Sequence, residues 1–209
     1  MAVFSGHDIE CIRGDRLVLK NTGFHLSSGH ALLLKGANGV GKSTLLRLMA
    51  GLMRPVSGRV AWDGTDIADD PAEHNQRLVY IGHADAVKPA LSVLENVSFW
   101  ADLAGPGGMP MADALQAFGI AHLADLPARY LSAGQRRRVN LTRMLTSGAA
   151  LWLLDEPTTA LDADTSAALS SLIDTHLKTG GMAVISTHAD LGLASAETLL
   201  LGATNTAAA

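Results

Sequence analysis

Short apolar runs alternate with longer amphipathic stretches through most of the chain. Ala31 to Leu34 is one such run, and the spacing beyond it predicts a helix from Thr44 to Met53. Ala149 to Leu154 and Met182 to Ser186 are two more, and both are almost entirely apolar. Runs of this kind are typical of strands that are buried on both faces of a parallel sheet. The pattern therefore predicts an α/β fold with a parallel-sheet core.

The N-terminal part has a different pattern, with strands close together and turns between them. Val3 to Ile12 and Arg16 to Leu26 are predicted to be strands on either side of a Gly14-Asp15 turn. Gly58 to Trp62 is predicted to be a strand that enters an Asp63-Gly64 turn. These segments predict an antiparallel β subdomain before and after the first buried run.

The middle of the chain is predicted to be mostly helical. A short strand, Leu78 to Ile81, comes first. A capping box at Ser92 then starts a helix that extends to about Leu103. Gly105 to Gly108 breaks this helix, and Met111 to Phe118 is a second one. Another capping box at Ser132 starts a helix that ends near Ser147.

The C-terminal part returns to alternating strands and helices. A helix from Asp164 to Leu177 is predicted between the two longest buried runs. Asp190 is expected to cap a short helix that extends to Ala196, and Thr198 to Leu201 is expected to be a last strand. The final residues, Thr204 to Ala209, are expected to fray.

Composition excludes several classes of protein. The chain has 209 residues, enough for one sizeable core or two small subdomains. Its net charge of −4 argues against a broad nucleic-acid-binding surface. The single cysteine, Cys11, excludes an internal disulfide framework and fits a reducing, cytoplasmic compartment. The apolar runs are too short to cross a bilayer and the N-terminus does not resemble a signal peptide, so membrane association is expected only through a partner.

The strongest chemical signal is the glycine-rich loop between the first buried run and the helix after it. Glycines let consecutive backbone N–H groups turn inward, and with the positive end of the helix these groups can hold a phosphate. Lys42 is expected to reach the β- and γ-phosphates of a nucleotide, and Ser43 to place its hydroxyl on Mg²⁺. A plain glycine turn that caps a helix would not need the full motif in this context. The predicted binding residues are Gly36, Ala37, Asn38, Gly39, Val40, Gly41, Lys42, Ser43 and Thr44.

Two acids follow the buried run that ends at Leu154. Ligands of open α/β sheets sit at the carboxyl ends of the strands, where Asp155 would lie. Asp155 is expected to hold Mg²⁺ through a water molecule. Glu156 would point at the γ-phosphate and polarise the attacking water as a general base, an effect worth about 10² to 10⁴ in rate. An isolated Asp-Glu pair would indicate no more than the end of a strand, but here the glycine loop favours the catalytic interpretation.

Leu131 to Gln135 distinguishes among the classes of nucleotide-binding protein. Taken alone, the segment is an ordinary helix start, with bare N–H groups and a glycine that permits close approach. Together with the loop and the two acids, it resembles the signature Leu-Ser-Gly-Gly-Gln of the ABC ATPases, with alanine where that family has its first glycine. The resemblance covers nearly the whole chain. It implies that ATP is also contacted by Ser132, Ala133, Gly134 and Gln135.

The family also implies a fold and an assembly. The expected fold is a single P-loop ATP-binding cassette over residues 1–209, with a RecA-like core and a helical subdomain at about residues 84–147. Two copies pair head to tail, so the glycine loop of one faces the signature helix of the other across ATP. Ala160 to Asp162 would join the subunits. His188 would be the switch histidine that contacts the γ-phosphate, although a lone histidine is more often structural.

The sequence leaves open the role of the arginines in the helix after the signature. The helix carries four arginines, which would face acidic neighbours or phosphates in the family's arrangement. A solvated basic face is an equally good interpretation for any one of them. They are Arg136, Arg137, Arg138 and Arg143.

Two positions depart from the common family pattern. His83 stands where the family has the glutamine that senses the γ-phosphate, as judged from the residues between Pro89 and Asn96. Its imidazole can donate to or accept from the nucleophilic water. No aromatic residue near Ile12 or Arg13 is available to stack on adenine. Arg13 or apolar contacts would then hold the base.

These departures resemble one subgroup, the ATP-binding export subunits of cytochrome c biogenesis. Its features here are Gly82-His83, the stretch Val87 to Trp100 and the alanine in the signature. The resemblance implies a peripheral position on the cytoplasmic face of a bacterial inner membrane, beside multispanning subunits. ATP hydrolysis there would energise release of a haem-loaded periplasmic chaperone, and no haem is expected on this chain.

Two other functions stay open. One is the ATPase of an ABC transporter for a different substrate. The other is a soluble ATP switch that clamps nucleic acid or ribosomes. Such switches usually carry two cassettes or a long coiled-coil insertion, and this chain shows one cassette, no heptads and no basic tail.

Overall fold

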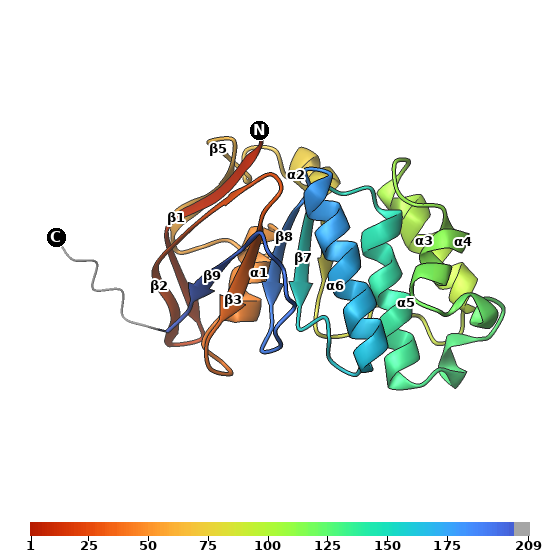
Figure 1. Ribbon diagram of the computed structural model, residues 1–209. Helices are drawn as coiled ribbons and strands as arrows, with labels where there is room; N and C mark the ends of the chain where they lie inside the picture. The colour runs from red at the N-terminus through yellow and green to blue at the C-terminus, as the bar shows by residue number, and fades with distance from the viewer. Residues whose placement is uncertain (203–209) are drawn as a thin grey trace.

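Two β-sheets with helices packed between and beside them build the protein (Figure 1). The computed structural model describes residues 1–202, so the expected fraying of Thr204 to Ala209 lies outside the described residues. Within the described part of the chain, one sheet has four strands and the other has five. No helix among residues 1–202 combines the length and the apolar character that a membrane span requires.

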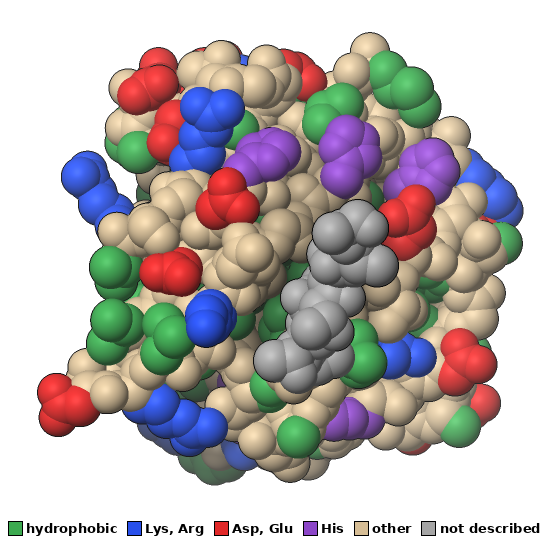
Figure 2. Space-filling model, turned by 90° about the vertical axis from the view of Figure 1, so that its left-hand side faces the viewer, with side chains coloured by type: hydrophobic (Ala, Val, Ile, Leu, Met, Phe, Trp, Pro, Cys, Tyr) green, Lys and Arg blue, Asp and Glu red, His purple; other side chains and the backbone are tan. Residues whose placement is uncertain are grey.

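The first sheet is antiparallel and comes from the N-terminal part of the chain. Its strands are β1 (Val3–Arg13), β2 (Arg16–Ser27), β4 (Ser57–Trp62) and β5 (Thr65–Asp66), in the order β2-β1-β4-β5. Residues Arg13 and Arg16 pair directly, which closes the hairpin over the predicted two-residue turn. The predicted strands of this region are confirmed. Basic and acidic side chains are interspersed on the side of the molecule where β1 and β2 lie (Figure 2).

The second sheet is parallel and forms the centre of the molecule. Its strands in spatial order are β6 (Leu78–Ile81), β7 (Leu151–Asp155), β8 (Met182–Ser186), β3 (Ala31–Lys35) and β9 (Ala196–Leu200). Every residue of β7 and β8 is buried. This burial on both faces explains why the two runs are apolar throughout rather than alternating.

Side chains of β7 alternate between two separate hydrophobic cores. Leu151 and Leu153 pack with α1 (Lys42–Met49) and the antiparallel sheet. Trp152 and Leu154 pack on the opposite face, with the helices described below. Each fully buried leucine side chain contributes roughly 1.5–3 kcal/mol relative to an exposed one. The strand that carries the two acids is therefore held firmly from both sides.

The helices on that opposite face are α3 (Val93–Ala104), α4 (Met111–Ala117), α5 (Ala133–Thr146) and α6 (Ala163–Lys178), with two short turns of 3₁₀ helix, η1 (Ala121–Leu123) and η2 (Ala128–Tyr130). Figure 1 shows α6 and α5 side by side next to β7, with α3 and α4 beyond them. Both predicted capping boxes, at Ser92 and Ser132, are present with their two reciprocal hydrogen bonds.

The structure differs from the sequence-based expectation at two helices. The predicted helix from Asp190 to Ala196 is wrong. The Asp190 side chain instead accepts from the N–H of Gly192 in a local turn, and β9 begins at Ala196. A helix that was not predicted, α2 (Pro71–Arg77), is capped by the Asp70 side chain, which accepts from the N–H of Glu73. An aspartate before a proline was a visible start signal.

Two imidazoles are packed into the fold. His176 on α6 stacks on Trp152, with ring centroids 3.8 Å apart and planes 4° apart. His74 on α2 is buried, and its Nε2 lies 2.8 Å from the carbonyl oxygen of Met49. Burial lowers the pKa of both imidazoles below their usual value. Charging either ring in the folded state is therefore unfavourable.

Because the pKa values of His74 and His176 are lowered by burial, we expect acid to destabilise the protein. Below about pH 6.5 the unfolded chain binds protons that the folded chain does not, so the free energy of unfolding falls as pH falls, by at most about 1.4 kcal/mol per pH unit and histidine. His176→Phe keeps a stacking ring without a titrating group. We expect this variant to lose less stability than the parent between about pH 7 and about pH 5, as measured by urea unfolding.

The exposed His122 supplies the matched control for that experiment. His122→Phe makes the same chemical change away from the stack and should leave the pH dependence as it is in the parent. If the free energy of unfolding falls with pH equally steeply in His176→Phe and in the parent, His176 does not cause the loss of stability in acid.

Candidate functional site

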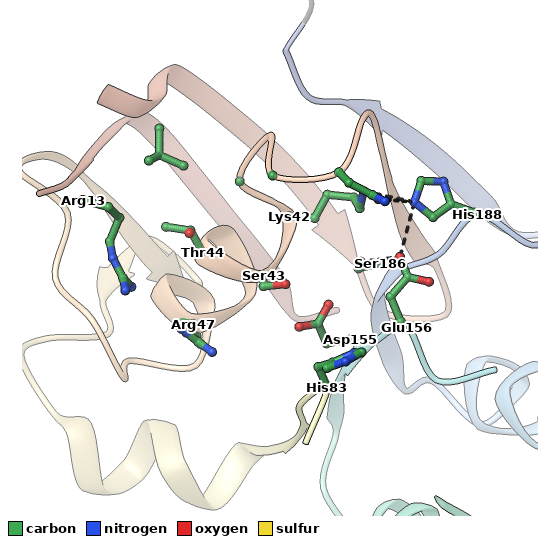
Figure 3. Close-up of a pocket in the computed structure, with 14 residues that line it drawn as sticks. Arg13, Lys42, Ser43, Thr44, Arg47, His83, Asp155, Glu156, Ser186 and His188 are labelled. Carbon is green, nitrogen blue, oxygen red and sulfur yellow. Dashed lines mark hydrogen bonds and ion pairs between the residues drawn. The ribbon is translucent and has the colours of Figure 1, made fainter. Parts of the chain in front are cut away.

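Polar side chains gather at the carboxyl edge of the parallel sheet. Asp155 ends β7 and is paired in register with Ser186, which ends β8. Leu34 of β3 is in register with the same serine, so the glycine loop begins at this edge too. A cavity of about 630 Å³ lies here, and Figure 3 shows its lining. The lining residues are Arg13, Val18, Asn38, Gly39, Gly41, Lys42, Ser43, Thr44, Arg47, His83, Asp155, Glu156, Ser186 and His188.

The glycine loop has the geometry of an anion site. Gly41 caps α1 with a φ of 116°, and a Cβ there would lie 2.9 Å from Leu19 and 3.0 Å from Val18. Only glycine fits that position, because both the backbone angle and the space exclude a side chain. The helix then starts at Lys42, so the free N–H groups of its first turn face the cavity lined by Ser43 and Thr44.

Lys42 is buried beneath the loop. Its Nζ donates to the carbonyl oxygens of Gly36, at 2.8 Å, and Ala37, at 3.3 Å. The same ammonium lies 3.3 Å from Nε2 of His188. The cation is therefore held at the start of the loop, next to the place where the loop's N–H groups can donate hydrogen bonds to a phosphate.

His188 joins the loop to the acids. Its Nε2 lies 3.1 Å from Oδ1 of Asn38 and 3.6 Å from Oε1 of Glu156 (Figure 3). One ring nitrogen cannot serve all of these neighbours at once. It accepts from Lys42 when it is unprotonated, and it donates to Asn38 or Glu156 when it carries the proton. The predicted histidine thus lies within reach of both the lysine and the proposed base.

Asp155 fits a divalent cation. The residue is 2% exposed, and within residues 1–202 its Oδ1 has no hydrogen-bond partner. An unpartnered buried carboxylate oxygen is costly unless a proton or a cation satisfies it. Ser43 lines the same cavity and offers a hydroxyl. The described residues contain no group of three or more His, Cys, Asp or Glu that could hold a metal. Mg²⁺ typically takes few protein ligands and completes its shell with water and phosphate oxygens.

Glu156 adopts a strained backbone conformation. Its φ is 47°, which a residue with a side chain rarely adopts and which costs on the order of 1–3 kcal/mol. The N–H of Glu156 donates to the carbonyl oxygen of Ser186 at 2.9 Å. Ser186 also donates through Oγ to Oε1 of Glu156, at 3.5 Å. The turn directs the carboxylate into the cavity instead of continuing the strand.

The other end of the cavity carries arginines. Arg13 lies there, and Arg47 comes from the last turn of α1 (Figure 3). Nη1 of Arg13 is 3.3 Å from the sulfur of Met53. Among the described residues that line the cavity, none is Phe, Tyr or Trp. Arg47 and Ser186 were not predicted as site residues, because their positions follow from how α1 and β8 pack and no motif marks them.

His83 also lines the cavity, and its side chain is exposed. It follows β6 after one residue, so it comes from the strand next to β7. Figure 3 shows His83 and Asp155 among the side chains that line the cavity. The structure therefore places His83, Asp155, Glu156 and His188 around one cavity, and the roles assigned to them from the sequence stay predictions.

The signature segment does not line this cavity. Ser132 and Gln135 cap α5 reciprocally, with Gln135 N–H donating to Ser132 Oγ at 3.2 Å and Ser132 N–H donating to Gln135 Oε1 at 2.8 Å. A Cβ at Gly134 would lie 2.7 Å from the carbonyl oxygen of Ala160. The loop at Ala160 thus packs directly on the start of α5. Within one copy of the described chain, the two predicted ATP-binding segments face different regions.

The arginines of α5 do not form a solvated basic face. Arg138 pairs with Asp162, the residue that caps α6. Hydrogen bonds from the Thr165 hydroxyl and N–H lower the pKa of that carboxyl. Arg143 lies over the Trp100 ring, 3.7 Å from its centroid, and burial lowers its pKa to about 10. Arg137 is buried and donates to several carbonyl groups around Asp155 and Glu156.

Comparison with known proteins identifies the family of the chain. A family model described as ABC transporter matches residues 19–159. The cytochrome c biogenesis ATP-binding export protein CcmA of Rhodospirillum rubrum is 52% identical over 96% of this chain and 86% of its own length. The protein of the same name from Paracoccus denitrificans is 44% identical over 97% of this chain and 90% of its own length.

Solved structures show the same architecture. One described as the ATP binding subunit of an ABC transporter matches 95% of this chain and 85% of its own, with a TM-score of 0.83 and 22% identity. A bacterial Atm1-family ABC exporter with ATP bound matches 95% of this chain and 36% of its own, with a TM-score of 0.82 and 24% identity. At such identities the likeness concerns the fold alone, and it confirms the predicted α/β cassette.

Proposed function

The chain belongs to the ABC transporter family, and on this premise we propose that it hydrolyses ATP to ADP and phosphate for a membrane export complex of c-type cytochrome biogenesis. The single observation that carries the ATPase part is the meeting of Lys42, Asp155, Glu156 and His188 in one cavity. The export part is supported by the names of relatives, one of which is 52% identical to this chain over 200 aligned residues.

Nucleotide binding is assigned to the glycine loop. The N–H groups from Gly36 to Thr44 and the ammonium of Lys42 surround the phosphates of ATP. The base lies toward Arg13, at the opposite end of the cavity from Glu156 (Figure 3). Arg13 can stack its planar guanidinium on adenine. This arrangement replaces the aromatic residue that many family members use.

Hydrolysis is assigned to the acids and histidines at the sheet edge. When Mg²⁺ is bound, held by Ser43 and Asp155, it neutralises charge on the phosphates. Glu156 accepts a proton from the attacking water, and His188 contacts the γ-phosphate and orients Glu156. His83 contacts the same water from the neighbouring strand. The strained backbone at Glu156 supports this assignment, because such strain concentrates at functional sites.

A complete site requires two copies of the chain. Residues Ser132 to Gln135 form the start of α5 and lie outside the cavity of their own chain. In a head-to-tail dimer this segment meets the ATP held by the partner's glycine loop, so two ATP molecules are shared between the subunits. Each copy is one ATP-binding domain, with the helices of about residues 84–147 as its helical subdomain.

Lys42→Ala and Glu156→Gln should separate ATP binding from hydrolysis. Lys42→Ala removes the cation from the phosphates, so ATP affinity should fall by at least about 10-fold. Glu156→Gln keeps the contacts to ATP but loses the base, so hydrolysis should fall about 10² to 10⁴-fold while ATP traps a dimer. Nucleotide binding, phosphate release and light scattering measure these outcomes.

Lys35→Ala is the matched control for the lysine, since Lys35 ends β3 and does not line the cavity. ATP affinity that is unchanged in Lys42→Ala would overturn the loop assignment. Hydrolysis at the parent rate in Glu156→Gln would show that another group is the base.

The location and the cargo are proposed from the similarity to the cytochrome c biogenesis ATP-binding export proteins. The chain lies peripherally on the cytoplasmic face of a bacterial inner membrane, bound to multispanning subunits. Its hydrolysis of ATP energises the release of a haem-loaded periplasmic chaperone. Haem stays with those partners and does not bind this chain.

Deletion of the gene from its host should abolish mature c-type cytochromes, measured by haem staining of membrane proteins. The parent gene should restore them and Glu156→Gln should not, because release needs hydrolysis. Affinity capture of the tagged chain from membranes should recover multispanning subunits. Normal c-type cytochromes in the deletion strain, with defective export of another compound, would favour a transporter for a different substrate.

His83 is proposed to couple hydrolysis to the membrane subunits, since its side chain is exposed at the mouth of the site. His83→Ala should therefore lower partner-stimulated hydrolysis more than basal hydrolysis. Both rates can be measured on the same preparation with and without the membrane subunits. Equal losses in the two rates would instead assign His83 a purely catalytic role.

A further inference from the structure

Arg137 is the most highly connected polar side chain near the site. It lies on α5, is 3% exposed, and its guanidinium donates to two separate loops. Nη2 donates to the carbonyl oxygens of Asp155 and Glu156, both at 2.9 Å. Nη1 donates to the carbonyl oxygen of Gly82 at 2.9 Å and to Oδ1 of Asp85 at 3.2 Å.

The two loops are those that carry the proposed catalytic groups. Gly82 immediately precedes His83, and the carbonyls of Asp155 and Glu156 belong to the acids themselves. Nε of Arg137 extends the contact to the carbonyl oxygen of Pro157, at 3.4 Å. Arg137 itself follows the signature residue Gln135 by two positions. One planar side chain therefore links the signature helix to both catalytic loops.

Arg137 provides one of the hydrogen bonds that hold the backbone of the strained turn at Glu156. The N–H of Glu156 is held by Ser186, and its carbonyl oxygen is held by Arg137. A residue stays in a sparsely populated conformation only where its surroundings fix it from several sides. Without Arg137, buried carbonyl oxygens would lose their donor, and the turn could relax toward an ordinary strand end.

We propose that Arg137 is a positioning residue that holds Glu156 and His83 in register with the signature helix. When the signature segment of one copy binds the ATP of its partner, Arg137 transmits that contact to the catalytic groups of its own site. The proposal rests on the proposed function, because it requires ATP hydrolysis in a head-to-tail dimer.

The proposal depends more on the shape of the Arg137 side chain than on its charge. Four of its five acceptors are neutral backbone carbonyls, and only Asp85 is charged. A guanidinium presents five N–H donors in a fixed plane, whereas a lysine ammonium donates from one point. A lysine at this position would keep the charge, but it could not donate to both loops at once.

The test compares Arg137→Gln and Arg137→Lys in the full chain, alone and with its membrane subunits. We expect both variants to bind ATP as the parent does, since the glycine loop is untouched. The rate kcat should fall about 10²-fold, the typical effect of a misplacement near 1 Å. The Hill coefficient for ATP should fall toward one, because the link between the two sites is lost. Arg143→Gln is the matched control, because Arg143 is a second, partly buried arginine on the same helix.

Several results would overturn the proposal. A parent-like kcat and Hill coefficient in Arg137→Gln would do so directly. Parallel losses of ATP affinity, kcat and unfolding temperature in both variants would show that Arg137 only stabilises the fold. Full recovery of kcat in Arg137→Lys would show that charge is sufficient. If Arg137→Gln does not fold, Arg137→Lys decides, because it keeps the buried cation opposite Asp85. A parent protein that hydrolyses no ATP would instead refute the proposed function.

Discussion

Parallel pairing of β7 with β8, and of β8 with β3, brings the acids, Ser186 and the glycine loop to one edge of the sheet. Because parallel strands end at the same edge, this register brings Asp155, Ser186 and the start of the glycine loop together. The pairing depends in turn on the burial of β7 and β8 on both faces. A shift of one residue would exchange the side chains between the two cores and move the acids away from the loop.

Around this fixed edge the protein keeps several arrangements that are unfavourable when considered singly. Lys42 is buried under the loop, Asp155 has an unpartnered oxygen among the described residues, and Glu156 has a left-handed backbone. Each costs roughly 1–3 kcal/mol without compensation. The surrounding apolar cores supply the stability that allows these costs. The charges of Lys42 and Asp155 suit a ligand that brings phosphates and a cation.

The start of α5 contacts the segment from Asp155 to Asp162 at three places. Gly134 allows the carbonyl of Ala160 to approach closely, Arg138 pairs with Asp162, and Arg137 donates to the carbonyls of the acids. The signature segment and the catalytic turn therefore behave as one packed unit. In the proposed head-to-tail pair, one end of this unit would face the partner's nucleotide and the other would face its own. Under that proposal, this unit gives two separated sites a physical connection that needs no contact between their ligands.

The sequence by itself predicted most of the elements and the residues that gather around the cavity. Apolar runs marked β7 and β8, capping boxes marked α3 and α5, and the motifs identified Gly36 to Thr44 and the two acids, because each depends on local spacing. It failed where local signals compete, at the segment after Asp190 and at the short helix α2. Only the tertiary structure decided what the α5 arginines do. Helical spacing can indicate which side of a helix a residue occupies, but the loops that Arg137 joins are 55 and 18 residues away in sequence and meet only through the pairing of β6 with β7.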